Sequence, residues 1–180
     1  MDMNKGFTLI EIMTALAVFL IVMTISMGSI VGIFDINRKS QSLKIVMSNL
    51  NLSIESMARE MRFSKRYHCG ALGDLASPNN CPAGDSAMSF LTNENKQFLY
   101  RLNGTRIEKS EDGGLSFIPV TAPEITIEDL EFFVLGAGAA PTNTLQPKVF
   151  IKIKGYAGTK ESSRTDFVLQ TLVSQRELDS

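Results

Sequence analysis

The feature that most constrains this chain is an uninterrupted apolar run near its N-terminus. Residues 12–34 contain no charged side chain. As a helix with a rise of about 1.5 Å per residue, the run is about 35 Å long, enough to cross a hydrocarbon layer of about 30 Å. Glu11 stands directly before the run, where a carboxylate costs about 3 kcal/mol or more unless it finds a partner. The sequence therefore predicts one membrane-spanning helix and a functional role for Glu11.

The residues around Glu11 form a recognisable motif. Gly6 is followed by Phe7-Thr8-Leu9-Ile10-Glu11, after a short polar leader and before the charge-free run. This arrangement resembles the processing site of type IV pilins and of the pseudopilins of type II secretion. The resemblance implies that residues 1–6 are a leader, that a prepilin peptidase cuts the Gly6–Phe7 bond, and that Phe7 is then N-methylated.

The resemblance also gives Glu11 a partner. In the family, this glutamate pairs with the N-terminal amine of a neighbouring subunit during assembly. A cation from the next subunit would remove the cost of a lone carboxylate in an apolar surrounding. Residues 7–34 are then both a transmembrane segment and an assembly helix. A single-pass signal anchor that never polymerises is the alternative, with Glu11 at the lipid headgroups.

Charge counting leaves the orientation in the membrane open. Lys5 precedes the span, whereas Arg38 and Lys39 follow it, so the positive-inside rule does not favour a cytoplasmic N-terminus. The resemblance implies one, because Gly6 must reach a peptidase site on the cytoplasmic side. The expected location is the bacterial inner membrane, with the head outside the cytoplasm, and later a pilus or pseudopilus.

Two glycines lie within the apolar run. Gly28 and Gly32 have the small-xxx-small spacing that permits close approach of membrane helices. The alternative is a locally softened helix, because an interior glycine costs up to about 1 kcal/mol relative to alanine. Pilins often have a proline near this depth, and this chain has Gly28 there instead.

A stripe of apolar residues continues beyond the membrane segment. They recur at steps of three and four, which places them on one side of a helix. Ile45 and Leu52 are expected to broaden the buried face, which favours packing on a sheet over a coiled-coil stalk. The stripe consists of Leu43, Val46, Leu50, Ile54, Met57 and Met61.

The end of this helix is expected at Arg66. Lys65 and Arg66 are cations that suit a last turn, and Gly70 can serve as the stop. The sequence predicts one helix from about Phe7 to Arg66, in which residues 35–66 are the amphipathic continuation of the membrane segment.

Residues 67–180 have the pattern of a β-rich head. Cys69–Pro82 has the composition of a loop, and Asn103-Gly104 between two apolar runs indicates a hairpin. A helix followed by several strands with short turns predicts an α+β fold, with the helix on an antiparallel sheet. The expected strands are 87–91, 97–102, 105–109, 115–120, 125–135, 149–153 and 167–173.

Cys69 and Cys81 lie beyond the membrane segment. If that side is outside the cytoplasm they can form a disulfide, which would stabilise the head by about 3 kcal/mol. Two free thiols are the alternative. With a single histidine in the chain the ligands are too few for a standard structural zinc site, so we expect no metal and no cofactor.

Composition and motifs argue against other function classes. The net charge of −1 gives no footprint for nucleic acid, so a nucleic-acid partner is not expected. His68, the single histidine, follows no nucleophile motif, and simple exposure or capping explains its place beside Cys69. The sequence predicts a structural subunit with no catalytic residues.

Three stretches of the C-terminal half refine the resemblance. Residues 127–134, 147–153 and 167–176 are similar to strands of J-type minor pseudopilins and of related minor pilins. This implies a minor pseudopilin at or near the tip of a type II secretion pseudopilus. The implied partners are the prepilin peptidase, other minor and major subunits, the inner-membrane assembly platform, and the lipid bilayer before assembly. The alternative is a minor pilin of a type IV pilus, for adhesion, motility or DNA uptake.

Overall fold

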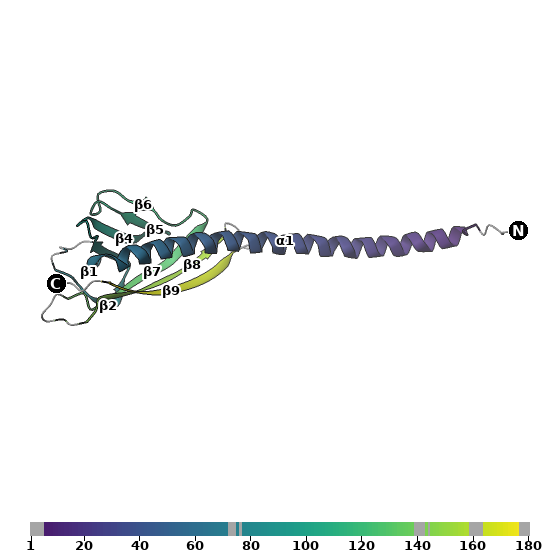
Figure 1. The fold of residues 1–180 in the computed structure, drawn as a ribbon. Helices are drawn as coiled ribbons and strands as arrows, with labels where there is room; N and C mark the ends of the chain where they lie inside the picture. The colour runs from purple at the N-terminus through teal and green to yellow at the C-terminus, as the bar shows by residue number, and fades with distance from the viewer. Residues whose placement is uncertain are drawn as a thin grey trace. The chain divides into compact units, whose positions relative to one another are not determined.

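The structure is a computed structural model that describes residues 6–71, 75, 77–138, 143, 145–158 and 164–176. The chain divides into two compact units, Met1–Gln41 and Ser42–Ser180, and each is described by itself. The described residues form one helix followed by nine strands (Figure 1). These elements are α1 (Leu9–Arg62), β1 (Lys65–Cys69), β2 (Cys81–Asp85), β3 (Ala87–Leu91), β4 (Gln97–Asn103), β5 (Arg106–Ser110), β6 (Ile118–Pro119), β7 (Ile125–Leu135), β8 (Lys148–Ala157) and β9 (Thr165–Ser174).

Within the second unit, the apolar stripe of α1 faces the sheets. Val46, Leu50, Met57 and Met61 are buried, and Leu43 and Ile54 are half-buried. The prediction that Leu52 broadens this face is wrong, because its side chain is 64% exposed. Two positions along a helix correspond to about 200° of rotation, so Leu52 points away from the face that holds Leu50. The side chain of Ile45 lies outside the described residues.

Helix α1 ends at Arg62 rather than at Arg66. The carbonyl of Met61 accepts hydrogen bonds from the hydroxyls of Ser64, at 2.6 Å, and Tyr67, at 2.7 Å. Lys65 and Arg66, predicted in the last helical turn, instead open strand β1, and Arg66 has a φ of 54°. Gly70 follows this strand and does not end the helix. The helix end is thus set by Ser64, which follows it, and by Tyr67 of β1. Local helix propensity carries no information about such contacts.

The α+β class is confirmed, but the head contains two antiparallel sheets instead of one. The five-stranded sheet has the order β1-β3-β4-β5-β6, and the four-stranded sheet has the order β2-β7-β8-β9. The sheets meet where Ile127 N donates a 2.9 Å hydrogen bond to Thr105 O, in the turn between β4 and β5. We call them sheet A and sheet B below.

Some strands differ from the predicted ranges. The segment 115–120 contributes only the short β6, because the amides of Leu115 and Ser116 donate to the carboxylate of Asp112 instead of to a neighbouring strand. The segment expected as a loop from Cys69 to Pro82 contains the end of β1 and the start of β2. The hairpin is present, with Gly104 at a φ of 59° and the strands closing at the Asn103–Arg106 pair.

Strand β7 runs along the middle of the head and contains a bulge. Its register against β8 shifts between Ile127 and Asp129. Ile127 and Leu130 therefore both point inward, although alternation alone would place them on opposite faces. The charged residues that interrupt the apolar pattern lie on the other face, where Lys152 contacts Glu131 at 2.6 Å and Asp129 at 3.2 Å.

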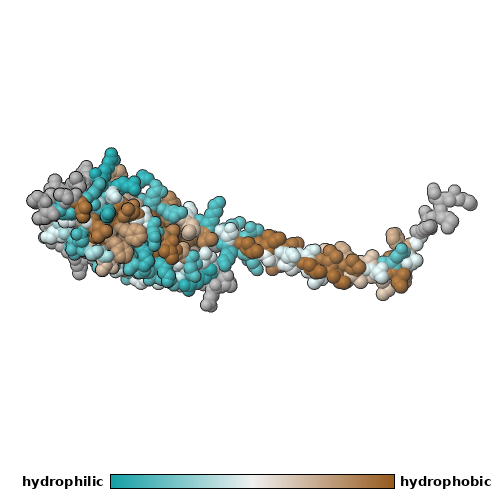
Figure 2. Space-filling view, turned by 90° about the horizontal axis from the view of Figure 1, so that it is seen from below, coloured by the Kyte–Doolittle hydropathy of each residue, from teal (hydrophilic) through white to brown (hydrophobic). Residues whose placement is uncertain are grey.

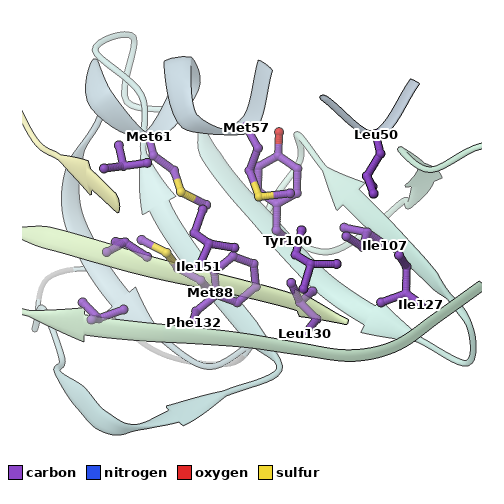
Figure 3. Close-up of a cluster of buried hydrophobic side chains, with 14 of the residues drawn as sticks. Leu50, Met57, Met61, Met88, Tyr100, Ile107, Ile127, Leu130, Phe132 and Ile151 are labelled. Carbon is purple, nitrogen blue, oxygen red and sulfur yellow. The ribbon is translucent and has the colours of Figure 1, made fainter. Parts of the chain in front are cut away.

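The core lies between the head part of α1 and both sheets (Figure 3). Leu50, Met57 and Met61 extend from the helix toward side chains of the strands. These strand residues are fully buried and come from β3, β4, β5, β7 and β8, so one core unites the two sheets: Met88, Tyr100, Ile107, Ile127, Leu130, Phe132 and Ile151.

Candidate assembly site

The first turn of α1 forms a closed hydrogen-bonded cap. Thr8 precedes the helix, and the amide of Glu11 lies 3.4 Å from the Thr8 hydroxyl. In return, Glu11 Oε2 accepts hydrogen bonds from the Thr8 amide at 3.1 Å and from the Thr8 hydroxyl at 3.0 Å. This reciprocal arrangement is a capping box, in which two otherwise unpaired backbone donors of a helix end are satisfied.

The cap changes the expectation for Glu11. Its carboxylate is not without partners in the single chain, because Thr8 supplies an amide and a hydroxyl. Both donors are neutral, however, and the Glu11 carboxylate makes no salt bridge within the described residues. The charge is therefore solvated locally but remains open to a cation from another chain.

The surface that follows Glu11 is apolar and uncovered. All side chains from Gly6 to Gln41 are exposed, and Figure 2 shows apolar side chains along this part of the helix. The described residues contain one helix long and apolar enough to cross a membrane, and none of its apolar window is buried within the chain. An apolar surface of this size requires a lipid or protein partner.

One side of this surface surrounds Glu11. A shallow hollow beside the carboxylate is lined by Phe7, Glu11, Ala15 and Phe19, at steps of four, together with residues of the adjoining row. Two aromatic rings thus flank one carboxylate. A cation that binds here would pair with Glu11 in an apolar surrounding, where a charge pair is stronger than in water.

The predicted cleavage site lies outside the helix. Gly6, Phe7 and Thr8 have no regular secondary structure, and Phe7 is 83% exposed. The Gly6–Phe7 bond is therefore accessible within this chain. Residues 1–5 of the predicted leader lie outside the described residues.

Gly28 and Gly32 are both helical and exposed. A Cβ added at either position would meet no atom within 4 Å outside the local backbone. The contacts of the single chain therefore do not explain why glycine stands at these positions. Their role in close helix packing or in local softening remains a prediction.

Cys69 and Cys81 form a disulfide, with an S–S distance of 2.06 Å. Cys69 ends β1, an outer strand of sheet A, and Cys81 begins β2, an outer strand of sheet B. The bond thus links the two sheets covalently. Neither sulfur is available as a thiolate in this state, so His68 has no cysteine nucleophile beside it.

The part of the chain that the structure describes holds no group of three or more His, Cys, Asp or Glu side chains suited to a metal ion. His68 is buried on β1, and its Nδ1 atom has no hydrogen-bond partner among the described residues.

Sequence analysis missed the role of Thr8. Its signal is present in the sequence as Thr8-x-x-Glu11, which is the capping-box pattern directly before an apolar run. The resemblance implies a partner for Glu11 on another subunit, whereas the hydrogen bonds from Thr8 come from its own chain.

Comparison with known proteins bears on the N-terminal segment. Residues 1–27 match the family model of the prokaryotic N-terminal methylation motif. No curated protein and no solved structure matches the chain. The matched segment contains the Gly6–Phe7 bond, the capping box and most of the apolar run, and it does not reach the head.

Proposed function

We propose that this chain, which carries the N-terminal methylation motif that marks the type IV pilin and pseudopilin family, is a minor pseudopilin that assembles through its N-terminal helix. The motif supports a pilin-like precursor that is processed by prepilin peptidase and assembled with other subunits of the family. Proteins of this family are generally structural and not catalytic. The motif and the one apolar helix fit a single-pass protein anchored in a membrane.

In this proposal the Gly6–Phe7 bond is cut by the prepilin peptidase. Cleavage creates an amine at Phe7, which is then methylated and remains cationic. The observation that carries the proposal is the arrangement at the first turn: an exposed apolar helix begins with one carboxylate, whose donors among the described residues are neutral. The amine of one subunit supplies the cation that the Glu11 of another subunit lacks.

The energies of the two states of Glu11 allow this exchange. A helix cap of this kind contributes about 1 kcal/mol. An amine cation adds to such hydrogen bonds an attraction between opposite charges, which the neutral donors of Thr8 lack and which is stronger where water is excluded. The capping box therefore keeps Glu11 satisfied in the stored subunit without preventing its transfer to an amine of a neighbour.

Transfer of the helix from lipid to a fibre is also tolerable. At about 25 cal/mol per Å², the apolar surface would cost far more in water than any single polar contact returns. Neighbouring helices bury the same surface that lipid covered before. Glu11 then sets the register, because a subunit displaced along the fibre axis leaves its carboxylate without the amine.

The proposed subtype rests on the head. The three stretches that resemble J-type minor pseudopilins overlap β7, β8 and β9, which pair consecutively in sheet B. A minor subunit of this type would sit at or near the tip and help to start assembly, with its precursor in the bacterial inner membrane and its head outside the cytoplasm. A minor pilin of a type IV pilus is the competing proposal.

Mass spectrometry of the mature protein tests the processing step. We expect the chain to begin at Phe7 and to carry one additional methyl group. An intact leader in cells that contain an active prepilin peptidase would overturn the assignment of the cleavage site.

Replacement of Glu11 tests the assembly step. Glu11→Leu should retain membrane insertion and cleavage, but should strongly reduce cross-linking to partner subunits. Glu55→Leu is a matched control, because Glu55 is an exposed glutamate on the same helix and its ion pair among the described residues is with Arg59. Equal cross-linking of both variants would favour an anchored protein that does not polymerise.

Identification of the cross-linked partners separates the two subtypes. Subunits of a secretion system would support the pseudopilin proposal. Pilus subunits alone would overturn it in favour of the minor pilin.

A further inference from the structure

The end of the head at which α1 stops carries a small polar pocket. About 20 Å³ of space is enclosed by Arg62, Phe63, Ser64, Asn93 and Arg176. These residues come from three distant parts of the chain: the end of the helix, the turn after β3 and the segment after β9. The helix ends and β1 begins at this same end of the head (Figure 1).

Backbone contacts hold the three parts together. Arg176 N donates a 2.9 Å hydrogen bond to Arg62 O, which closes the helix end. Lys65 stands opposite Leu91 in the register of β1 and β3, so the turn that contains Asn93 begins beside the helix end. The position of the pocket is therefore fixed by the main chain and does not depend on the two guanidinium groups.

No described carboxylate pairs with either arginine of the pocket. Within the described residues, neither Arg62 nor Arg176 makes a salt bridge, and the Arg176 guanidinium lies 5.6 Å from the ring centre of Phe63. Other arginines of the head are paired, such as Arg101 with Glu108 at 2.9 Å and Arg164 with Glu128 at 2.9 Å.

The carboxylates of Glu94 and Glu60, which lie near the pocket in the sequence, already bind other groups. Glu94 binds Lys96 at 2.8 Å. Glu60, in the last turns of the helix, accepts from Tyr100 and from Lys109, each at 2.7 Å. The helix C-terminus offers about half a negative charge, so among the described residues Arg62 and Arg176 leave a surplus of more than one positive charge.

We propose that this pocket is a carboxylate-binding site that receives an acidic side chain of an adjoining subunit. The volume is sufficient for one oxygen atom, and a planar guanidinium binds a carboxylate through two parallel hydrogen bonds. Asn93 and Ser64 add uncharged polar groups. The half-exposed ring of Phe63 gives the edge of the pocket an apolar contact for the stem of a glutamate or aspartate.

The identity of the partner rests on the proposed function, in which the head adjoins other subunits. The binding of a carboxylate by the pocket does not depend on the proposed function, and it can be measured on the protein alone. This separation allows the pocket and the assembly proposal to fail independently.

Amide chemical shifts of the full mature chain in micelles test the pocket, with acetate as the probe and chloride of equal ionic strength as the reference. We expect saturable shifts at Ser64, Asn93 and Arg176. Arg176→Gln, which keeps the backbone bond to Arg62, should weaken acetate binding by about tenfold. Absence of saturable shifts would overturn the site.

Arg106→Gln is the matched control. Arg106 is exposed and makes no salt bridge within the described residues, but it lies at the β4–β5 hairpin. It should leave acetate binding unchanged. An equal loss in both variants would mean nonspecific attraction to positive charge and would overturn the proposal.

A chain that lacks residues 177–180 tests a competing occupant, because Glu177 follows Arg176 directly and Asp179 comes two residues after Glu177. Acetate binding that appears only after this truncation would assign the pocket to the chain's own C-terminus and overturn the proposed partner.

Cross-linking in membranes tests the partner itself. Arg176→Gln should reduce cross-links from the head to a neighbour, whereas Glu11-dependent insertion into the fibre persists. If the wild-type pocket binds acetate but Arg176→Gln leaves the cross-links from the head unchanged, the proposed role of an adjoining subunit is also overturned. If the wild-type chain itself does not assemble with other subunits, the proposed function is overturned. The result for acetate binding remains valid in that case.

Discussion

The phenol of Tyr100 donates a 2.7 Å hydrogen bond to Glu60 Oε2 and thereby joins strand β4 to the last turns of helix α1. The other oxygen of Glu60 lies 2.7 Å from Lys109 Nζ, and Lys109 also contacts Glu111 at 2.7 Å. The Lys109 ammonium lies 4.4 Å from the ring centre of Phe98. This cluster fixes the helix to sheet A through Tyr100 and Lys109, which are largely removed from water, whereas Glu60 is half-buried and Glu111 is exposed.

The cluster predicts a loss of stability in alkali. Burial raises the pKa of Tyr100, and the charge of Glu60 raises it further. Burial opposes the charged form of Lys109, but hydrogen bonds to Glu111 and Glu60 outweigh it, so the pKa of Lys109 is also raised. Above about pH 10 the folded head therefore binds more protons than the unfolded chain.

The free energy of unfolding should keep this contribution below about pH 10 and lose it as the pH rises further. Denaturant titrations of the full chain in micelles at several pH values measure the slope. Tyr100→Phe should make the slope shallower, because one of the two groups no longer titrates. An identical slope in wild type and variant would contradict this account.

A Cβ at position 155 should destabilise the head. An alanine Cβ there would fall well inside contact distance of the Thr126 carbonyl oxygen and 3.1 Å from the Ile127 Cα, both backbone atoms of β7 that cannot rotate away. We expect Gly155→Ala to lower the free energy of unfolding by about 2 kcal/mol.

Gly138→Ala is the control for this substitution. Its Cβ would meet its nearest neighbour, the side chain of Asn143, at 3.4 Å, and the φ of Gly138 is not positive. It should cost clearly less than Gly155→Ala in the same denaturant titration. Equal costs would show that the close approach of β7 and β8 is not the cause.

The disulfide should contribute strongly to head stability. Cys69 and Cys81 are separated by 12 positions, and closing a loop of this size restricts the unfolded chain by about 3 kcal/mol. We expect the double variant Cys69→Ser/Cys81→Ser to lose about that amount, and reduction of wild type to produce the same loss. A loss below about 1 kcal/mol would indicate that strand pairing alone holds β2.

The capping box predicts the behaviour of the first helical turn. Thr8→Val keeps the size of the side chain but removes the hydroxyl that contacts Glu11. The amides of Ile10, Glu11 and Ile12 should exchange with deuterium several-fold faster, which corresponds to about 1 kcal/mol.

Thr8→Ser is the matched control, because it restores the hydroxyl, and it should return protection close to the wild-type level. Hydrogen exchange of the micelle-bound chain measures both variants. Equal protection in Thr8→Val and wild type would mean that the cap does not stabilise the turn.

Local patterns in the sequence were sufficient for much of the fold. The charge-free run and the stripe that follows it specified a helix, because hydropathy and period are properties of neighbouring residues. The ranges predicted for β3 and β7, 87–91 and 125–135, agree with the structure. Turn residues on both sides of β3 set the two ends of that strand. The apolar segment of β7 is long enough to keep its predicted range despite one bulge.

Features set by contacts between distant residues were not predicted. The helix end depends on Tyr67 and Arg176, whose backbone and side-chain bonds replace a local stop signal. The division into two sheets depends on which strands pair, and the turn signals carry no information on pairing partners. The pocket at Arg62 combines residues from three separate segments.

The candidate assembly site was more accessible to sequence reasoning, because it occupies consecutive residues. Gly6, Phe7 and Glu11 were identified from one motif, which the family model also matches. What the motif could not reveal is the geometry of Thr8, since the hydrogen bonds exist only when the turn is folded.

The covalent bond between β1 and β2 has a mechanical consequence. It joins an outer strand of one sheet to an outer strand of the other. Tension that pulls the two sheets apart is therefore carried first by this covalent bond. The hydrogen bonds between strands are loaded only after it. Strand β9, at the opposite margin of sheet B and without such a fastening, is where a stretched head would begin to peel.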